Sequence, residues 1–124
     1  MEGKMTTSIF DEINKRIILL DGGMGTELFA RGFPPGACPE SWNVDKPEVV
    51  KEILTNYYDA GSDAVLTNTF GGNKIKLKSY DLGERCYEFN LAAATIANQV
   101  KPEGKFLAGS MGPTGKFLKP TRPS

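Results

Sequence analysis

Three short apolar runs, at residues 17–20, 63–68 and 105–110, constrain the fold more than any other feature of this sequence. The first run, IILL, is continuously aliphatic. A strand with one wet face would alternate apolar and polar residues, so this run predicts a strand covered on both faces. Segments with helical periodicity, at residues 47–60 and 84–100, separate the runs. Strands separated by helices favour crossover connections, and the sequence therefore predicts an α/β fold with a parallel sheet.

The helix boundaries follow from capping signals. Residues 1–15 predict an N-terminal helix with Ser8 as its cap. Residues 26–31 predict a helical turn that Gly32 closes, and residues 32–43 read as a proline-rich loop. Asp45 and Glu48 resemble a capping box at the start of the helix over 47–60, and Gly61 ends that helix. A further loop, with room for a short helix, follows the second strand.

Composition excludes several classes of function. Lys+Arg and Asp+Glu number 15 each, so no basic field indicates nucleic acid or an anionic membrane. The chain contains no histidine, which rules out Ser-His and Cys-His nucleophile pairs and His-ligated metals within it. Cys38 and Cys86 read as free thiols. With no apolar run long enough to span a bilayer, we expect a cytoplasmic protein without membrane contact.

All three apolar runs end in a polar residue followed by glycine. The polar residues are Asp21, Asn68, Thr69 and Ser110. Because the carboxyl ends of parallel strands lie on the same side of a sheet, these residues are expected to converge on one rim, where α/β proteins place their sites. For any single strand, ordinary turn chemistry explains the same residues. Three coincident endings favour a site.

The chemistry of the first strand end matches a zwitterion. The carboxylate of Asp21 can hold an ammonium group, and the glycines of DGGMG leave backbone N–H groups uncovered for an anion. An α-amino acid presents both groups side by side.

Nucleotide-binding motifs fit poorly. The glycines at 22, 23 and 25 do not form G-x-G-x-x-G. In GSMGPTGKF, Gly109 and Gly115 are one residue too far apart for a Walker A loop, and Phe117 replaces the Ser or Thr that binds Mg²⁺. Trp42, Tyr57 and Tyr58 indicate packing rather than cofactor stacking. Lys74, Lys76 and Lys78 read as a solvated face.

Five stretches together resemble one known family. ILLDGGMGTEL, CPESWNVDKPEVVKEI, YYDAGSDAVLTNTFGGN, ERCYEFNLAAATIA and LAGSMGPTGKFLKP occur in the order and spacing of the homocysteine-binding domain of homocysteine S-methyltransferases. The resemblance implies a (β/α)8 TIM barrel. Such a barrel needs about 250 residues, so residues 1–124 would form a partial domain, with the first three strands and their helices in residues 16–124. We expect an N-terminal fragment of a longer enzyme.

The resemblance also implies a substrate site. Asp21 would bind the ammonium of homocysteine, and the backbone amides of Gly22, Gly23 and Met24 would bind its carboxylate. Asn68, Thr69 and Ser110 would line the same pocket.

The family's chemistry uses Zn²⁺, held by three cysteines, to make the homocysteine thiolate that accepts the methyl group. Cys38 and Cys86 match none of those positions, and the ligating segments would lie beyond Ser124. The chain alone is therefore expected neither to bind zinc tightly nor to transfer methyl groups. The methyl donor stays open, with cobalamin as one possible carrier.

Two other hypotheses for the function of this chain remain. The chain could be a non-catalytic or split-chain partner that self-associates or binds a second chain through its open sheet edge. It could instead serve a corrinoid-linked methyltransferase with another thiol or methyl substrate.

Overall fold

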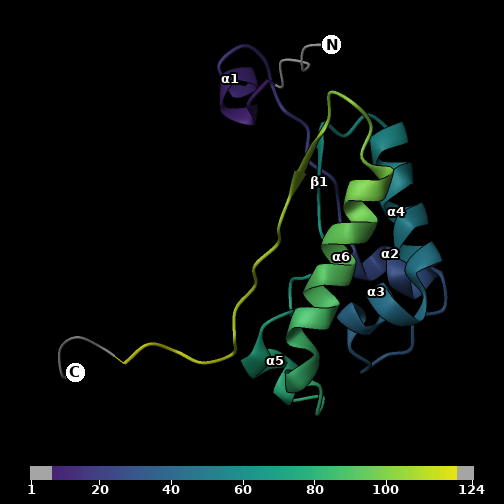
Figure 1. Ribbon diagram of the computed structural model, residues 1–124, viewed down its shortest axis with the longest axis vertical. Helices are drawn as coiled ribbons and strands as arrows, with labels where there is room; N and C mark the ends of the chain where they lie inside the picture. Colours follow the sequence, from purple (N-terminus) through teal and green to yellow (C-terminus); the bar gives the residue numbers. More distant parts are fainter. Residues whose placement is uncertain (1–6, 120–124) are drawn as a thin grey trace, which may run out of the picture.

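The computed structural model describes residues 7–119 and confirms a mixed α/β fold with parallel strands (Figure 1). β1 (Ala64–Leu66) pairs in parallel with β2 (Phe106–Ala108), with Val65 opposite Leu107. The two long helices, α4 (Pro47–Asp59) and α6 (Cys86–Val100), contact each other, and α4 also contacts β1. Both helices were expected at these places from their periodicity.

Shorter elements occupy the connections. They are α1 (Ile9–Ile13), α2 (Gly25–Ala30), the 3-10 turn η1 (Pro39–Ser41), α3 (Trp42–Asp45), α5 (Lys74–Lys78) and the 3-10 turn η2 (Gly83–Arg85). Ser8 caps α1 as predicted, because its hydroxyl accepts the N–H of Phe10. Gly32 follows α2 with φ 92°, a left-handed conformation that glycine adopts without strain. Among residues 7–119, no helix is long and apolar enough to cross a bilayer.

The prediction for residues 17–20 was wrong in one respect. The segment lies beside β1, but only Leu20 forms a bridge, to Ala64, and it is not a strand covered on both faces. The side chain of Ile17 is 84% exposed and that of Leu20 is 59% exposed. The long helices contact β1 and each other, and the exposed side chains of Ile17, Leu19 and Leu20 show that the segment is not covered on both faces. A continuous aliphatic run indicates that a segment is stable only when both of its faces are buried. The described residues do not bury both faces of this segment.

Two further expectations are corrected near α4. Asp45 and Glu48 do not form a capping box, because Lys46 is the N-cap residue and makes no side-chain capping bond; Pro47 alone marks the first turn. The predicted loop over 32–43 contains η1 and the beginning of α3. These turns form because the segment packs into the core, which local composition does not report.

The core lies between α2, α4, α6 and β1. Its buried members include Leu28, Ile53, Leu54, Val65 and Ile96. Trp42 and Tyr58 are buried with them, as the packing interpretation predicted. A second cluster, Cys38, Leu77 and Phe89, packs η1 against α5 and α6. The core thereby holds the segments that precede and follow β1 in one place.

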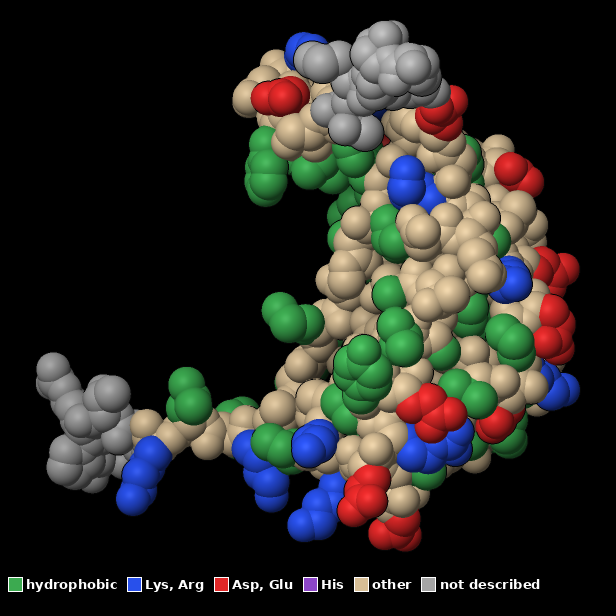
Figure 2. Space-filling model, viewed as in Figure 1, with side chains coloured by type: hydrophobic (Ala, Val, Ile, Leu, Met, Phe, Trp, Pro, Cys, Tyr) green, Lys and Arg blue, Asp and Glu red, His purple; other side chains and the backbone are tan. Residues whose placement is uncertain are grey.

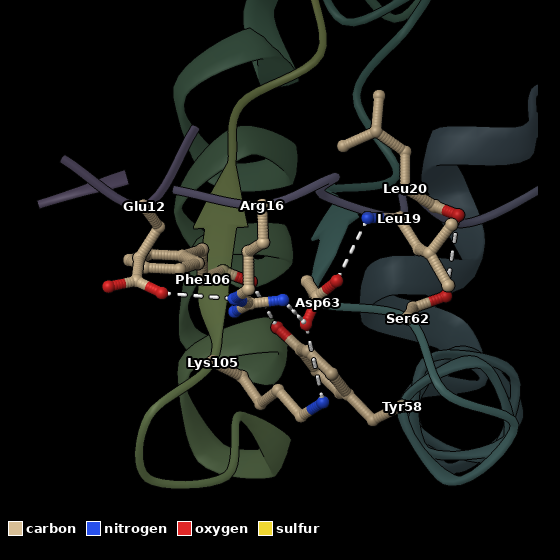
Figure 3. Close-up of polar contacts among 9 residues, drawn as sticks. All are labelled: Glu12, Arg16, Leu19, Leu20, Tyr58, Ser62, Asp63, Lys105 and Phe106. Atoms are coloured by element: carbon tan, nitrogen blue, oxygen red, sulfur yellow. Dashed lines mark hydrogen bonds and ion pairs between the residues drawn. The ribbon is translucent and has the colours of Figure 1, made fainter. Parts of the chain in front are cut away.

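A charged cluster joins the amino ends of the three strand segments (Figure 3). Asp63 Oδ1 pairs with Arg16 at 3.0 Å and Lys105 at 3.8 Å, while Oδ2 accepts the backbone N–H of Leu19 at 2.9 Å. The N–H of Leu19 and the Arg16 guanidinium hold the pKa of Asp63 below its ordinary value. Because Leu19 directly precedes the bridging residue Leu20, and Asp63 and Lys105 directly precede β1 and β2, this cluster aligns the segments and their opposite ends.

Candidate functional site

The polar strand ends surround one cavity of about 350 Å³. Five of the seven residues predicted for the site line it: Asp21, Gly22, Met24, Asn68 and Ser110. These residues follow the first apolar run, β1 and β2. The predicted convergence of the three strand ends is therefore observed. Gly23 and Thr69 lie next to lining residues but do not themselves line the cavity.

Asp21 is held at the carboxyl end of the sheet by a hydrogen bond to the backbone. Its Oδ2 accepts the N–H of Leu66, the last residue of β1, at 3.1 Å. Burial raises the pKa of Asp21 above its ordinary value, and the hydrogen bond from Leu66 opposes this shift. A half-buried carboxylate with no cation paired to it among residues 7–119 can accept a cationic ligand group.

The glycine loop is fixed from behind by α4. The hydroxyl of Tyr57 donates to the carbonyl of Gly23 at 2.6 Å. A Cβ on Gly22 would lie 3.0 Å from the same hydroxyl, so glycine permits this close approach. In the described part of the chain, the N–H groups of Gly22, Gly23 and Met24 have no hydrogen-bond partner. They remain available to an acceptor.

The side-chain N–H groups of Asn68 hold the cavity wall and are not free to bind a ligand. Its Nδ2 donates to the Pro39 carbonyl and to Asn43 Oδ1, both at 3.0 Å. Asn43 returns a bond from its Nδ2 to the Asn68 carbonyl at 2.9 Å. This paired-amide contact joins the end of β1 to η1 and α3.

Hydroxyl groups join the ends of β1 and β2. Thr69 Oγ1 donates to the Ser110 carbonyl at 2.8 Å and lies 2.7 Å from Thr67 Oγ1. The N–H of Ser110 donates to Thr67 Oγ1 at 3.2 Å. The Thr69 side chain therefore connects the two strand ends, while Thr67 and Ser110 of this group line the cavity.

Sequence reasoning missed several lining residues. They are Glu40, Thr67, Phe70, Lys76 and Tyr80. Lys76 is exposed, as the prediction of a solvated face for this segment requires, yet it also borders the cavity. The one signal for Glu40 is that it is the sole charged residue in the loop over residues 32–43.

The two cysteines do not fit a metal site. Burial and the neighbouring Glu40 raise the pKa of Cys38 to about 11, which disfavours the thiolate that a metal requires. The thiol of Cys86 donates to the Gly72 carbonyl at 3.2 Å. Within residues 7–119, no group of three or more His, Cys, Asp or Glu residues is placed to hold an ion.

Comparison with known proteins identifies the family. Residues 18–124 match the family model described as homocysteine S-methyltransferase. The methionine synthase of Mycobacterium tuberculosis is 36% identical over 125 residues, which cover 90% of this chain and 10% of that protein. The methionine synthase of Mycobacterium leprae is 32% identical over the same shares. The chain thus spans about a tenth of the length of these curated relatives.

Solved structures agree with this match. The homocysteine methyltransferase MmuM from Escherichia coli, in its oxidized form, superposes with a TM-score of 0.68 at 28% identity. That match covers 83% of this chain and 40% of MmuM. The metallated form of MmuM gives the same TM-score and covers 84% and 41% of the two chains. The chain therefore belongs to the homocysteine S-methyltransferase family, and it corresponds to a part of the family domain.

Proposed function

We propose that this chain forms the first three strands of a (β/α)8 barrel and supplies the amino-acid-binding part of an enzyme that methylates the thiol of homocysteine. One observation carries the proposal: side chains and loops from three separate strand ends, Asp21 among them, line a single cavity. A cavity of about 350 Å³ is large enough for a small amino acid.

Opposite charges in the substrate would meet complementary groups of the chain. The ammonium would be bound by the Asp21 carboxylate, which Leu66 holds in place. The carboxylate would accept hydrogen bonds from the free N–H groups of Gly22, Gly23 and Met24. Because an ionised partner strengthens each bond, both ends of the amino acid would contribute to affinity.

Zinc, which the family resemblance implies, would stabilise the substrate thiolate when bound. The described residues do not fit it, since neither cysteine belongs to a cluster of ligands and the pKa of Cys38 is raised to about 11. The role proposed for this chain is therefore limited to binding and orienting the amino acid part of the substrate.

Titration of the ¹⁵N-labelled chain with homocysteine, followed by amide NMR shifts, tests this proposal. We expect shifts centred on residues 21–25, 66–68 and 110. Asp21→Asn should weaken binding by roughly tenfold, the effect of losing one charged hydrogen bond. Asp59→Asn, at an exposed position at the end of α4, is the matched control and should bind like the unsubstituted chain. Unchanged affinity in Asp21→Asn would refute the assignment.

A second candidate role is that of a partner within an assembled barrel. Large apolar side chains are exposed on the described surface, among them Ile17, Leu19, Leu20, Phe70 and Met111. Figure 2 shows hydrophobic side chains along the concave edge of the molecule. An uncovered strand segment next to β1 and exposed apolar side chains favour association with further chain.

Sedimentation velocity tests this second role. Ile17→Lys should abolish a discrete oligomer if this surface mediates it. Tyr87→Lys replaces a side chain that is 78% exposed on α6 and serves as the control. A monomer at all concentrations in the unsubstituted chain would argue against self-association.

A further inference from the structure

Glu40 is a buried carboxylate in the wall of the same cavity. It lies in η1 and is only 3% exposed. Glutamate is almost never fully buried without a charged partner, because removal of its hydration is costly. The position therefore calls for a compensating group.

Two donors contact this carboxylate, and neither is charged. Oε2 accepts the N–H of Gly71 at 2.8 Å, and Oε1 accepts the weak S–H donor of Cys38 at 3.4 Å. An ionised carboxylate has about four acceptor sites, so about two remain open. Among residues 7–119, no lysine or arginine forms an ion pair with Glu40.

The cavity is bordered by a second carboxylate. Asp21 and Glu40 both line it, from the end of the first apolar run and from η1 respectively. Lys76 also lines it, but its side chain is exposed and forms no ion pair within the described residues. Two carboxylates without a paired cation give the cavity a negative potential, which a cationic ligand group would neutralise.

We propose that Glu40 is a specificity-determining residue that acts with Asp21 to select ligands bearing an ammonium group. This inference rests on the proposed function, because it assumes that an amino acid thiol occupies the cavity. Asp21 holds the ammonium directly, and Glu40 adds attraction that a ligand without the amino group does not feel. The Gly71 contact keeps the carboxylate in place: a Cβ on Gly71 would lie 3.3 Å from Oε1, so the turn approaches Glu40 closely.

The substitution Glu40→Gln separates charge from shape. Glutamine keeps the length of the side chain, and its carbonyl oxygen can still accept the N–H of Gly71. Glu48→Gln, at an exposed position in the first turn of α4, is the matched control for loss of one negative charge. Fluorescence of the sole tryptophan, the buried Trp42 close to Glu40, reports whether the variant is folded.

The test compares two ligands by NMR titration of the full 124-residue chain. Homocysteine carries the amino group, and 4-sulfanylbutanoate is the same thiol acid without it. We expect Glu40→Gln to weaken homocysteine binding by roughly fivefold to tenfold, as for the loss of one buried charge interaction. Binding of 4-sulfanylbutanoate should change less than twofold, and Glu48→Gln should change neither.

Equal losses for both ligands, or no loss for either, would overturn the inference and leave Glu40 only as the acceptor that holds the turn at Gly71. If Glu40→Gln does not fold, the ¹³C shift of the Glu40 carboxyl carbon in the unsubstituted chain replaces it. That shift should move with homocysteine and not with 4-sulfanylbutanoate; the same response to both ligands would overturn the inference. Failure of the unsubstituted chain to bind either thiol would instead remove the proposed function, and this inference with it.

Discussion

Asn43 is expected to be the most sensitive polar residue of the described chain. It is 2% exposed and makes three hydrogen bonds through one side-chain amide. Its Nδ2 donates to the carbonyls of Asn68 and Phe89, at 2.9 and 3.2 Å, and its Oδ1 accepts from Asn68. One side chain thus joins the end of β1 to α6 through α3.

Asn43→Ala leaves those partners without their bonds. Each buried group left unsatisfied costs about 1–3 kcal/mol. The amide of Asn68 keeps its second bond, to the Pro39 carbonyl, and the Phe89 carbonyl lies inside α6 and keeps its helical hydrogen bond, so the Asn68 carbonyl carries most of the loss. We expect the free energy of unfolding to fall by about 1–3 kcal/mol, a substantial part of the stability of a typical domain.

Urea unfolding followed by Trp42 fluorescence measures this change, since Trp42 is the neighbouring residue and the sole tryptophan. Asn56→Ala, at an exposed position within α4, is the matched control and should be neutral or slightly stabilising. A loss below about 1 kcal/mol for Asn43→Ala would show that water replaces the amide, and it would refute the claim that this contact holds the cavity wall.

Three further outcomes follow from the described contacts. Tyr57→Phe removes the hydrogen bond to the Gly23 carbonyl. We expect this variant to lower the unfolding free energy by about 1 kcal/mol and to weaken homocysteine binding in the NMR titration. Equal affinity would contradict a role of Tyr57 in holding the glycine loop. Gly112→Ala places a Cβ in steric conflict with the Phe70 carbonyl oxygen, so the amide shifts of residues 69–72 should change strongly, and an unperturbed spectrum would contradict the contact. Asp63 has a lowered pKa, so its stabilising contribution is complete above the unfolded pKa of about 3.9 and is lost as pH falls through the folded value. Asp63→Asn should therefore reduce the fall in unfolding free energy at acid pH, measured by urea unfolding over a pH series. An unchanged fall at acid pH would contradict the role of the cluster.

The candidate site was predictable in part from local pattern. Residues that end parallel strands must share one edge, and this rule was sufficient to bring Asp21, Asn68 and Ser110 to one cavity. The same rule could not assign side-chain roles. Thr69 and Asn68 have the donors and acceptors of a binding residue, but the structure uses their donors to join neighbouring segments.

The sequence by itself determined the parallel α/β pattern, the two long helices and the edge on which the polar residues meet, because hydrophobic period and glycine placement are local properties. Only the tertiary structure decided which segments are covered and which carboxylates face the cavity. Residues 17–20 required cover that the described residues do not give, and Glu40 reached the cavity because a loop of 12 residues, 32–43, folded back onto the end of β1. Burial depends on residues distant in the chain, and no local pattern reports it.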